Sequence, residues 1–340
     1  MPDWNTTDPR DPMKDDLIEF TELSTGRGPV ERAEAVAAEA DELVSTKPLS
    51  PWADTWRRLK RNKLALVGLV IITIFVVVGV AEEIAYLAHV NLAPYPPNHV
   101  DYTQLTPEGY PAPPSLKHPF GTDDFGRDVF SRTLVATRVS LLVGVIAVAI
   151  AVAIGLSLGP VSGYYGGKVD SVIMRIADVF FAYPYILFVL LIMTVLGPGF
   201  RNVFIAIGIL SWATFARLNR GSVLSVRAME FVEAARAQGA SDLRVIFRHV
   251  LPNTMAPVYV AIAMGVGGAI VTEAALSYLG IGTRPPNASW GKMIADYYSM
   301  LWAGYWWMMT FPSIFLVATV FGFISFGNGL RDATDPKLKE

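Results

Sequence analysis

A charged segment at 230–253, EFVEAARAQGASDLRVIFRHVLPN, has the residue types and spacing expected of a protein-binding helix. Strong helix formers and the absence of proline predict a short helix over 231–240. Ala234, Ala235 and Gly239 are small and lie near one another on a helical wheel, so a partner's backbone can approach closely. Charged neighbours would orient that partner: Glu233, Arg236, Arg244 and Arg248. The pattern favours a helix docked in a groove of another protein; the alternative is an amphipathic helix lying on lipid headgroups.

A second polar feature lies inside an apolar run, where Glu273 is the one ionisable residue well away from the ends. Steps of four residues from Ala261 give a small and polar stripe that reaches Glu273 and Ser277. Small residues at this spacing favour close packing of helices in lipid, and a carboxylate there should face the bundle or a water-filled path. Glu273 and Ser277 therefore line a translocation path or hold helices together, and both interpretations stay open.

Three other patterns resemble reactive sites. The loop 118–132, HPFGTDDFGRDVFSR, has several carboxylates but only His118 nearby, so a structural ion-pair network is preferred to a metal or catalytic site. The glycine-rich stretch at 163–168 lacks the first glycine of a phosphate loop, and Val169 replaces its Ser or Thr. The stretch at 265–268 lacks a third spaced glycine. No ATP site, metal or cofactor is expected in this chain.

Long apolar runs must position these residues. Of the 340 residues 52% are hydrophobic and none is cysteine, so disulfides are excluded. Runs of about 18 residues or more suffice to cross a bilayer. An all-α integral membrane fold with six transmembrane helices is predicted, with spans near 64–81, 139–161, 179–196, 203–216, 254–279 and 306–330.

Lysine and arginine are distributed unevenly between the connections. With a cytoplasmic N-terminus the inside segments hold 16 of them and the outside segments hold 7. The positive-inside rule therefore places both termini and the loop 217–253 in the cytoplasm, between spans four and five. The loop at 82–138 would lie outside, and its many prolines predict an irregular structure.

The N-terminal region differs from the rest in composition. Residues 1–49 form an acidic tail, expected to be disordered or marginally helical. Ser50-Pro51 starts a basic helix over 50–63, as an N-cap serine followed by proline at the first helical position. Its tryptophans and arginines suit the membrane interface; these anchors are Trp52, Trp56, Arg57, Arg58 and Arg61. Nucleic-acid binding is excluded because an apolar run follows at once.

Five parts are thus expected along the chain. They are the tail 1–49, the interfacial helix 50–63, the first span with the proline-rich loop 64–138, the transmembrane core 139–330 and a cytoplasmic tail 331–340.

The charged segment resembles the EAA loop of permeases of ATP-binding-cassette (ABC) importers. That pattern is Glu-Ala-Ala, three residues, Gly, nine residues, then aliphatic-x-Leu-Pro. It is matched at 233–235, Gly239 and 251–252, and departs at His249, where an aliphatic residue is usual. The resemblance implies a coupling helix that docks on a cytoplasmic ATPase through Glu233, Ala234, Ala235 and Gly239. Arg236 and Asp242 are added as contacts from their position alone.

The resemblance extends over 50–336 and is closest to the C-type permease of dipeptide and oligopeptide importers. Besides 118–132, the segments that carry it are 57–68, 163–184, 273–293 and 327–336. It implies a multi-pass protein of the cell inner membrane that pairs with a homologous second permease. It also implies two ATPase subunits, which bind ATP and Mg, and an extracytoplasmic substrate-binding protein. Short peptides are the expected substrates, with nickel chelates or oligosaccharides as alternatives.

Two other classes of protein remain as alternatives. An ion-coupled secondary transporter would use Glu273 as its proton site, and it predicts internal repeats with paired broken helices. A membrane-anchored hydrolase would use the loop 118–132, which lacks a nucleophile and base. Neither explains the residues at 233–239.

Overall fold

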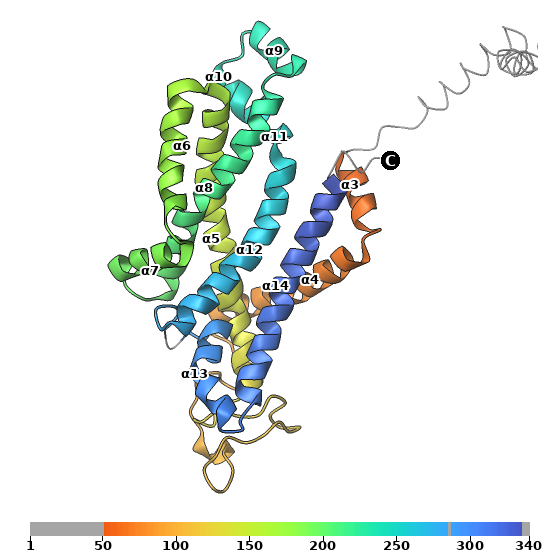
Figure 1. Cartoon of the computed structure of the whole chain (residues 1–340). Helices are drawn as coiled ribbons and strands as arrows, with labels where there is room; N and C mark the ends of the chain where they lie inside the picture. Colours follow the sequence, from red (N-terminus) through yellow and green to blue (C-terminus); the bar gives the residue numbers. More distant parts are fainter. Residues whose placement is uncertain (1–50, 285–286, 335–340) are drawn as a thin grey trace, which may run out of the picture. The chain divides into compact units, whose positions relative to one another are not determined.

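The computed structural model describes residues 51–284 and 287–334, without the side chains of Pro51 and Trp52. The predicted tail 1–49 and the last six residues lie outside the described part. The contacts within the chain divide it after Asp54, and the residues from Thr55 onward form one compact unit. Within the described residues the fold is helical, as predicted (Figure 1). The described residues contain no β-strand, and one isolated β-bridge joins Thr122 to Asp128.

The helices follow one another with short connections except after the first long one. In chain order they are α3 (Pro51–Leu59), α4 (Lys63–Leu87), the 3-10 turn η1 (Tyr102–Gln104), α5 (Val129–Tyr165), α6 (Gly167–Ala182), α7 (Tyr185–Leu196), α8 (Phe200–Val226), α9 (Glu230–Ala237), α10 (Asp242–Arg244), the π-helical turn η2 (Val245–Val250), α11 (Leu251–Asn253), α12 (Met255–Tyr278), α13 (Trp290–Trp302) and α14 (Trp307–Thr334). Helix α3 begins at Pro51, as its sequence predicts.

Five of the described helices are long and apolar enough to cross a membrane: α4, α5, α8, α12 and α14. A sixth span results if α6 and α7 are counted together. Helix α9 lies at one end of these helices, and α13 with the irregular segment 88–128 lies at the other (Figure 1). The predicted proline-rich loop is therefore irregular, as expected.

The second long helix begins ten residues before the predicted span at 139–161, because α5 starts at Val129. Two arginines within its first turns, Arg132 and Arg138, end the apolar run in the sequence, yet each finds a hydrogen-bond partner for its Nη1 in the fold, while the buried Nε of each has none among the described residues. Arg132 donates to the carbonyl of Pro97 at 2.9 Å. Arg138 pairs with Glu83 at 3.1 Å. Buried charges are acceptable where they are paired, so the loop before α5 ends at residue 128 rather than 138.

The predicted span at 179–196 is two helices that meet at 94°. The break falls at Tyr183, which has extended backbone angles (φ −108°, ψ 147°), and at Pro184. Proline lacks the amide hydrogen that a continuous helix needs and forces the preceding residue out of the helical region. The span predicted over 179–196 therefore consists of two helices rather than one, and Pro184 is the residue in the sequence that marks the break.

Helix α13 was not predicted, because Lys292 and Asp296 interrupt its apolar pattern. Ser289 caps it by accepting a hydrogen bond from the Lys292 amide at 3.2 Å. The Trp290 side chain is fully buried, and its indole nitrogen donates to the Thr133 carbonyl of α5 at 3.1 Å. Helix α13 is therefore a packed part of the fold that lies against the first turns of α5.

The most extensive helix packing joins α5 to α8, through glycines spaced four residues apart. A Cβ atom on Gly155 would lie 2.6 Å from the Cβ of Phe215, and one on Gly159 would lie 2.6 Å from the Ala216 carbonyl oxygen. A Cβ atom cannot come this close to another atom, so the two helices approach more closely here than any residue but glycine allows, as small residues permit in lipid. These glycines hold the two helices together where no larger residue fits.

Replacing Gly159 with leucine should separate α5 from α8. Overpacking a tight contact costs about 1–3 kcal/mol or more, so we expect Gly159→Leu to lower the midpoint of thermal unfolding and the yield of monodisperse protein in detergent. Gly221→Leu is the matched control. Gly221 lies on α8, the partner helix, and a Cβ there meets nothing within 4 Å among the described residues. Equal thermal midpoints for the two variants would contradict the close contact.

Candidate functional site

The connection after α8 carries the short helix α9, which is eight residues long and ends at Ala237 rather than at the predicted residue 240. Its first turn holds Glu230 and Glu233, and Arg236 lies in its last turn. Acidic side chains near the start of a helix and basic ones near its end complement the helix dipole. The charges that could orient a partner thus also stabilise the helix.

Gly239 follows α9 in a left-handed backbone conformation, with φ of +79°. The amide of Ala240 donates to the Ala235 carbonyl at 3.1 Å and closes the last turn. Glycine is the residue that adopts this conformation after a helix without strain. A Cβ at Gly239 would meet nothing within 4 Å in this chain. Its backbone angle, rather than crowding within the chain, is therefore what calls for glycine.

The predicted binding residues divide into an exposed set and a buried one. Glu233, Ala234, Arg236, Gly239 and Asp242 are exposed, whereas Ala235 is 9% exposed. Ala235 packs in a small apolar cluster with Val232 and Tyr164. Four apolar side chains near them in the sequence are also exposed: Met229, Phe231, Leu243 and Phe247. We call these nine exposed residues the α9 face; it combines charged, small and apolar residues.

Tyr164, near the end of α5, holds the connection in place. Its hydroxyl donates to Asp242 at 2.9 Å and accepts from Arg236 Nε at 3.0 Å. The Arg236 guanidinium also lies 4.8 Å from the centre of the Tyr164 ring. Arg236 and Asp242 are therefore joined through one residue that the sequence did not identify. The only signal was a tyrosine pair at the end of an apolar run, 72 residues before Arg236.

Further polar contacts tie the same end of the bundle together. Arg227 donates to the carbonyls of Gly163 and Tyr164 at 2.7 and 3.1 Å and so satisfies the end of α5. Arg220 of α8 makes two hydrogen bonds to Asp170 of α6, at 2.5 and 2.6 Å.

The residue that departs from the EAA pattern, His249, lies half-buried in the π-helical turn η2. Turns of this kind occur often at functional sites.

Glu273 is fully buried in α12. Its Oε1 accepts hydrogen bonds from Ser277 at 2.7 Å, Thr283 at 3.0 Å and Ser289 at 2.7 Å. Its Oε2 is buried and has no hydrogen-bond partner within the described part of the chain. Glu273 and Ser277 thus join α12 to the segment that leads into α13, an arrangement that matches the helix-packing interpretation. Their part in a translocation path stays a prediction.

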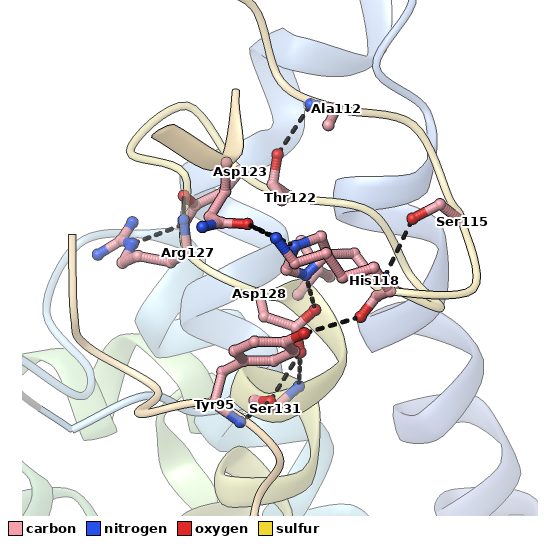
Figure 2. A network of polar contacts seen from close by, with 12 residues as sticks. Tyr95, Ala112, Ser115, His118, Thr122, Asp123, Arg127, Asp128 and Ser131 are labelled. Carbon is pink, nitrogen blue, oxygen red and sulfur yellow. Dashed lines mark hydrogen bonds and ion pairs between the residues drawn. The ribbon is translucent and has the colours of Figure 1, made fainter. Parts of the chain in front are cut away.

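At the opposite end, the segment before α5 is held by a network of paired charges (Figure 2). His118 Nδ1 lies 2.9 Å from Asp128 Oδ1, and Asp128 Oδ2 accepts from the Ser131 amide and hydroxyl at 2.7 Å. Asp123 pairs with Arg127 at 2.6 Å and accepts from the Tyr297 hydroxyl at 2.7 Å. The prediction of a structural ion-pair network is confirmed.

Burial affects the pKa values of acidic groups in this network. Burial raises the pKa of the Asp124 carboxyl, and the neighbouring Asp123 carboxylate adds to the effect. Burial also raises the pKa of the Tyr297 hydroxyl, which therefore stays protonated as the donor to Asp123. The network fixes α13 to the segment before α5.

Helix α3 carries the predicted interface anchors except Arg61, because the helix ends at Leu59 rather than at the predicted residue 63. Trp56 is 47% exposed, and the Lys60 ammonium lies 5.3 Å from its ring centre. Arg57 and Arg61 are exposed, and Arg58 is half-buried. The side chain of Trp52 lies outside the described residues. An anchoring role for these residues stays a prediction.

The apolar helices and the charged connection between α8 and α12 define a polytopic α-helical membrane protein. Sequence comparison identifies the family within this class. A family described as the binding-protein-dependent transport system inner membrane component matches residues 151–340. A second family, the N-terminal TM domain of oligopeptide transport permease C, matches residues 50–114. The chain belongs to the family of inner membrane components of binding-protein-dependent transport systems.

Several relatives are similar over most of their length. The dipeptide transport system permease protein DppC of Bacillus subtilis is 42% identical, over 88% of this chain and 90% of its own. The oligopeptide transport system permease protein OppC of the same organism is 42% identical, over 91% and 97%. The glutathione transport system permease protein GsiD of Pectobacterium atrosepticum is 40% identical, over 91% and 98%.

One solved structure shares the fold. It is an inward-facing conformation of the MetNI methionine ABC transporter, which matches with a TM-score of 0.50 and 17% identity. The match covers 60% of this chain and 97% of that one. At this level of identity the similarity concerns the arrangement of the helices.

Tyr164→Phe removes one hydroxyl and leaves the ring in place. We expect it to loosen α9, because a neutral hydrogen bond contributes about 1 kcal/mol and bonds to charged groups contribute more. Amide hydrogen exchange over 230–244 should become roughly five- to thirtyfold faster, with exchange elsewhere unchanged. Tyr165→Phe is the control, since that neighbouring side chain is 47% exposed. Equal exchange in the two variants would contradict the role given to Tyr164.

Proposed function

We propose that this chain is the permease subunit of an ABC importer for short peptides and that α9 is its coupling helix. The observation that carries this proposal is the α9 face, an exposed set of charged, small and apolar residues on a short helix that the rest of the fold holds rigidly. Exposed apolar side chains beside charged ones suit docking to another protein. The chain's family, the inner membrane components of binding-protein-dependent transport systems, indicates that this partner is an ATPase subunit.

The proposed complex contains this chain, a homologous second permease, two cytoplasmic ATPase subunits and an extracytoplasmic binding protein. ATP and Mg would be bound by the ATPases, and this chain would itself catalyse nothing. We take α6 and α7 together as one of six spans, with both termini and the α9 face in the cytoplasm. The excess of lysine and arginine on that side supports this orientation.

Peptides are proposed as the substrate class because three relatives of 40–42% identity are named for dipeptide, oligopeptide and glutathione transport. The single bent pair of helices, α6 and α7, does not form the two broken spans that an ion-coupled secondary transporter would be expected to have. The described residues therefore favour the ATP-driven importer.

Reversing the charge of Glu233 should release the ATPase. We expect a tagged wild-type chain, purified from detergent-solubilised membranes, to bring with it an ATPase and a second permease. Glu233→Arg should retain the permease and lose most of the ATPase. A change of about 1–3 kcal/mol in a docking contact lowers affinity by roughly five- to 150-fold. The readout is the amount of each partner in the eluate, measured by mass spectrometry.

The matched control is Glu230→Arg, which changes the same charge in the same helix turn outside the Glu-Ala-Ala motif. It should retain the ATPase. Loss in both variants would indicate a general effect of charge and would contradict a specific role for Glu233. Recovery of the wild-type chain without an ATPase would overturn the proposed importer. It would favour the ion-coupled secondary transporter, with Glu273 as its proton site.

A further inference from the structure

A hollow of about 520 Å³ opens among the apolar helices, with walls from α5, α7, α8 and α12. Its volume lies within the range of sites that bind small molecules. No Asp, Glu, Lys, Arg or His lines it among the described residues. Its distinctive lining is small or hydroxyl-bearing: Tyr185, Ser211, Thr214, Gly265, Gly268 and Thr272.

Three of its hydroxyl groups have their protons engaged, so their oxygens are left to accept hydrogen bonds. Ser211 donates to the Ile207 carbonyl at 2.8 Å, and Thr272 donates to the Gly268 carbonyl at 3.0 Å. Tyr185 lies 3.2 Å from the Ser211 oxygen. Because Ser211 has given its proton to its own helix, Tyr185 is the donor in this pair. The Ser211 oxygen thus accepts from Tyr185, and Thr272 also hydrogen-bonds Tyr185. Because each hydroxyl oxygen has two lone pairs, acceptors still remain for a ligand.

The glycines here differ from those between α5 and α8. A Cβ on Gly268 would meet nothing within 4 Å, and one on Gly265 would make only ordinary contacts at 3.4 and 3.5 Å. No neighbouring backbone therefore requires glycine at these positions. Their effect is to keep the hollow open, because a larger side chain would project into the empty space.

We propose that this hollow is a transit site for the peptide backbone, where acceptor oxygens receive amide N–H groups of the moving peptide. The inference rests on the proposed function. A short peptide that leaves water exposes N–H groups that are costly to leave unpaired, and Tyr185, Ser211 and Thr272 offer them partners. Since no charged residue lines the site, it binds what all peptides share rather than one side chain.

Two other occupants fit the hollow less well. A lipid acyl chain has no donor group and would leave every acceptor unused. A helix of the second permease satisfies its own backbone N–H groups internally, so its backbone would leave the acceptors unused and only side-chain donors could reach them. A peptide in transit is the occupant whose chemistry matches the walls.

The first test fills the hollow. We expect Gly268→Phe to lower uptake of labelled trialanine by about tenfold or more in proteoliposomes that contain the full complex, with ATPase and second permease still co-purified. Gly221→Phe is the matched control, because a Cβ there also meets nothing within 4 Å and Gly221 lies outside the hollow. Uptake by Gly268→Phe equal to wild type would overturn the proposal. Loss of the second permease from that variant would also overturn it, in favour of a partner helix.

The second test removes one acceptor. Thr272→Val nearly preserves volume but lacks the oxygen, and we expect uptake of trialanine to fall about three- to tenfold, the effect of one hydrogen bond. Thr272→Ser keeps the hydroxyl and should transport normally. With trialanine methylated at its amide nitrogens, Thr272→Val and wild type should transport alike. A Thr272→Val variant equal to Thr272→Ser on both peptides would overturn the acceptor role.

These outcomes separate the two proposals. If the wild-type complex binds an ATPase and imports trialanine, the importer stands whatever the variants do. If the wild type imports no peptide, the proposed function fails and the transit site fails with it.

Discussion

The contact of α5 with α8 is the interaction on which the rest of this structure depends. Gly155 and Gly159 bring the two backbones so close that no side chain separates them. Helix α5 is 37 residues long and reaches both ends of the bundle. At one end Asp128 caps it within the network of Figure 2, and at the other Tyr164 holds α9. Elements far apart in the sequence are thus fixed to one common support.

Local features of the sequence predicted much of this arrangement. The spacing of residues 233–239 indicated α9, and uninterrupted apolar runs indicated most of the long helices. Features that depend on distant partners were missed. The start of α5 at Val129 depends on Arg138 finding Glu83, 55 residues away. The role of Tyr164 depends on residues 72 and 78 positions later. The hydropathy pattern of a sequence shows which residues are polar. It does not show whether a polar residue forms a hydrogen bond or ion pair with a residue far away in the chain.

The small and polar stripe predicted on α12 lies in two different surroundings. Steps of four residues from Ala261 rotate about 40° further each time, since each residue turns about 100°. The third step reaches Glu273, which has rotated out of the hollow and is buried against other elements. Alternating steps of four and three stay on one face, and they give Gly265, Gly268 and Thr272, which line the hollow. Ala261, Gly265 and Ala269 of the predicted stripe also line the hollow, whereas Glu273 does not, and its part in a translocation path stays a prediction.

Helices α5 and α8 contact both the proposed transit site and the proposed coupling helix α9. Residues of α5 and α8 form walls of the hollow, and residues of both helices pack against α9. Side chains in a soft interface can absorb a displacement by changing rotamer, but backbone in contact with backbone cannot. A movement of α9 imposed by a partner would therefore carry α5 and α8 together and would change the shape of the hollow between them and α12. Rigid movement of packed helices is an established route for such coupling, and the glycines between α5 and α8 would make that route available here.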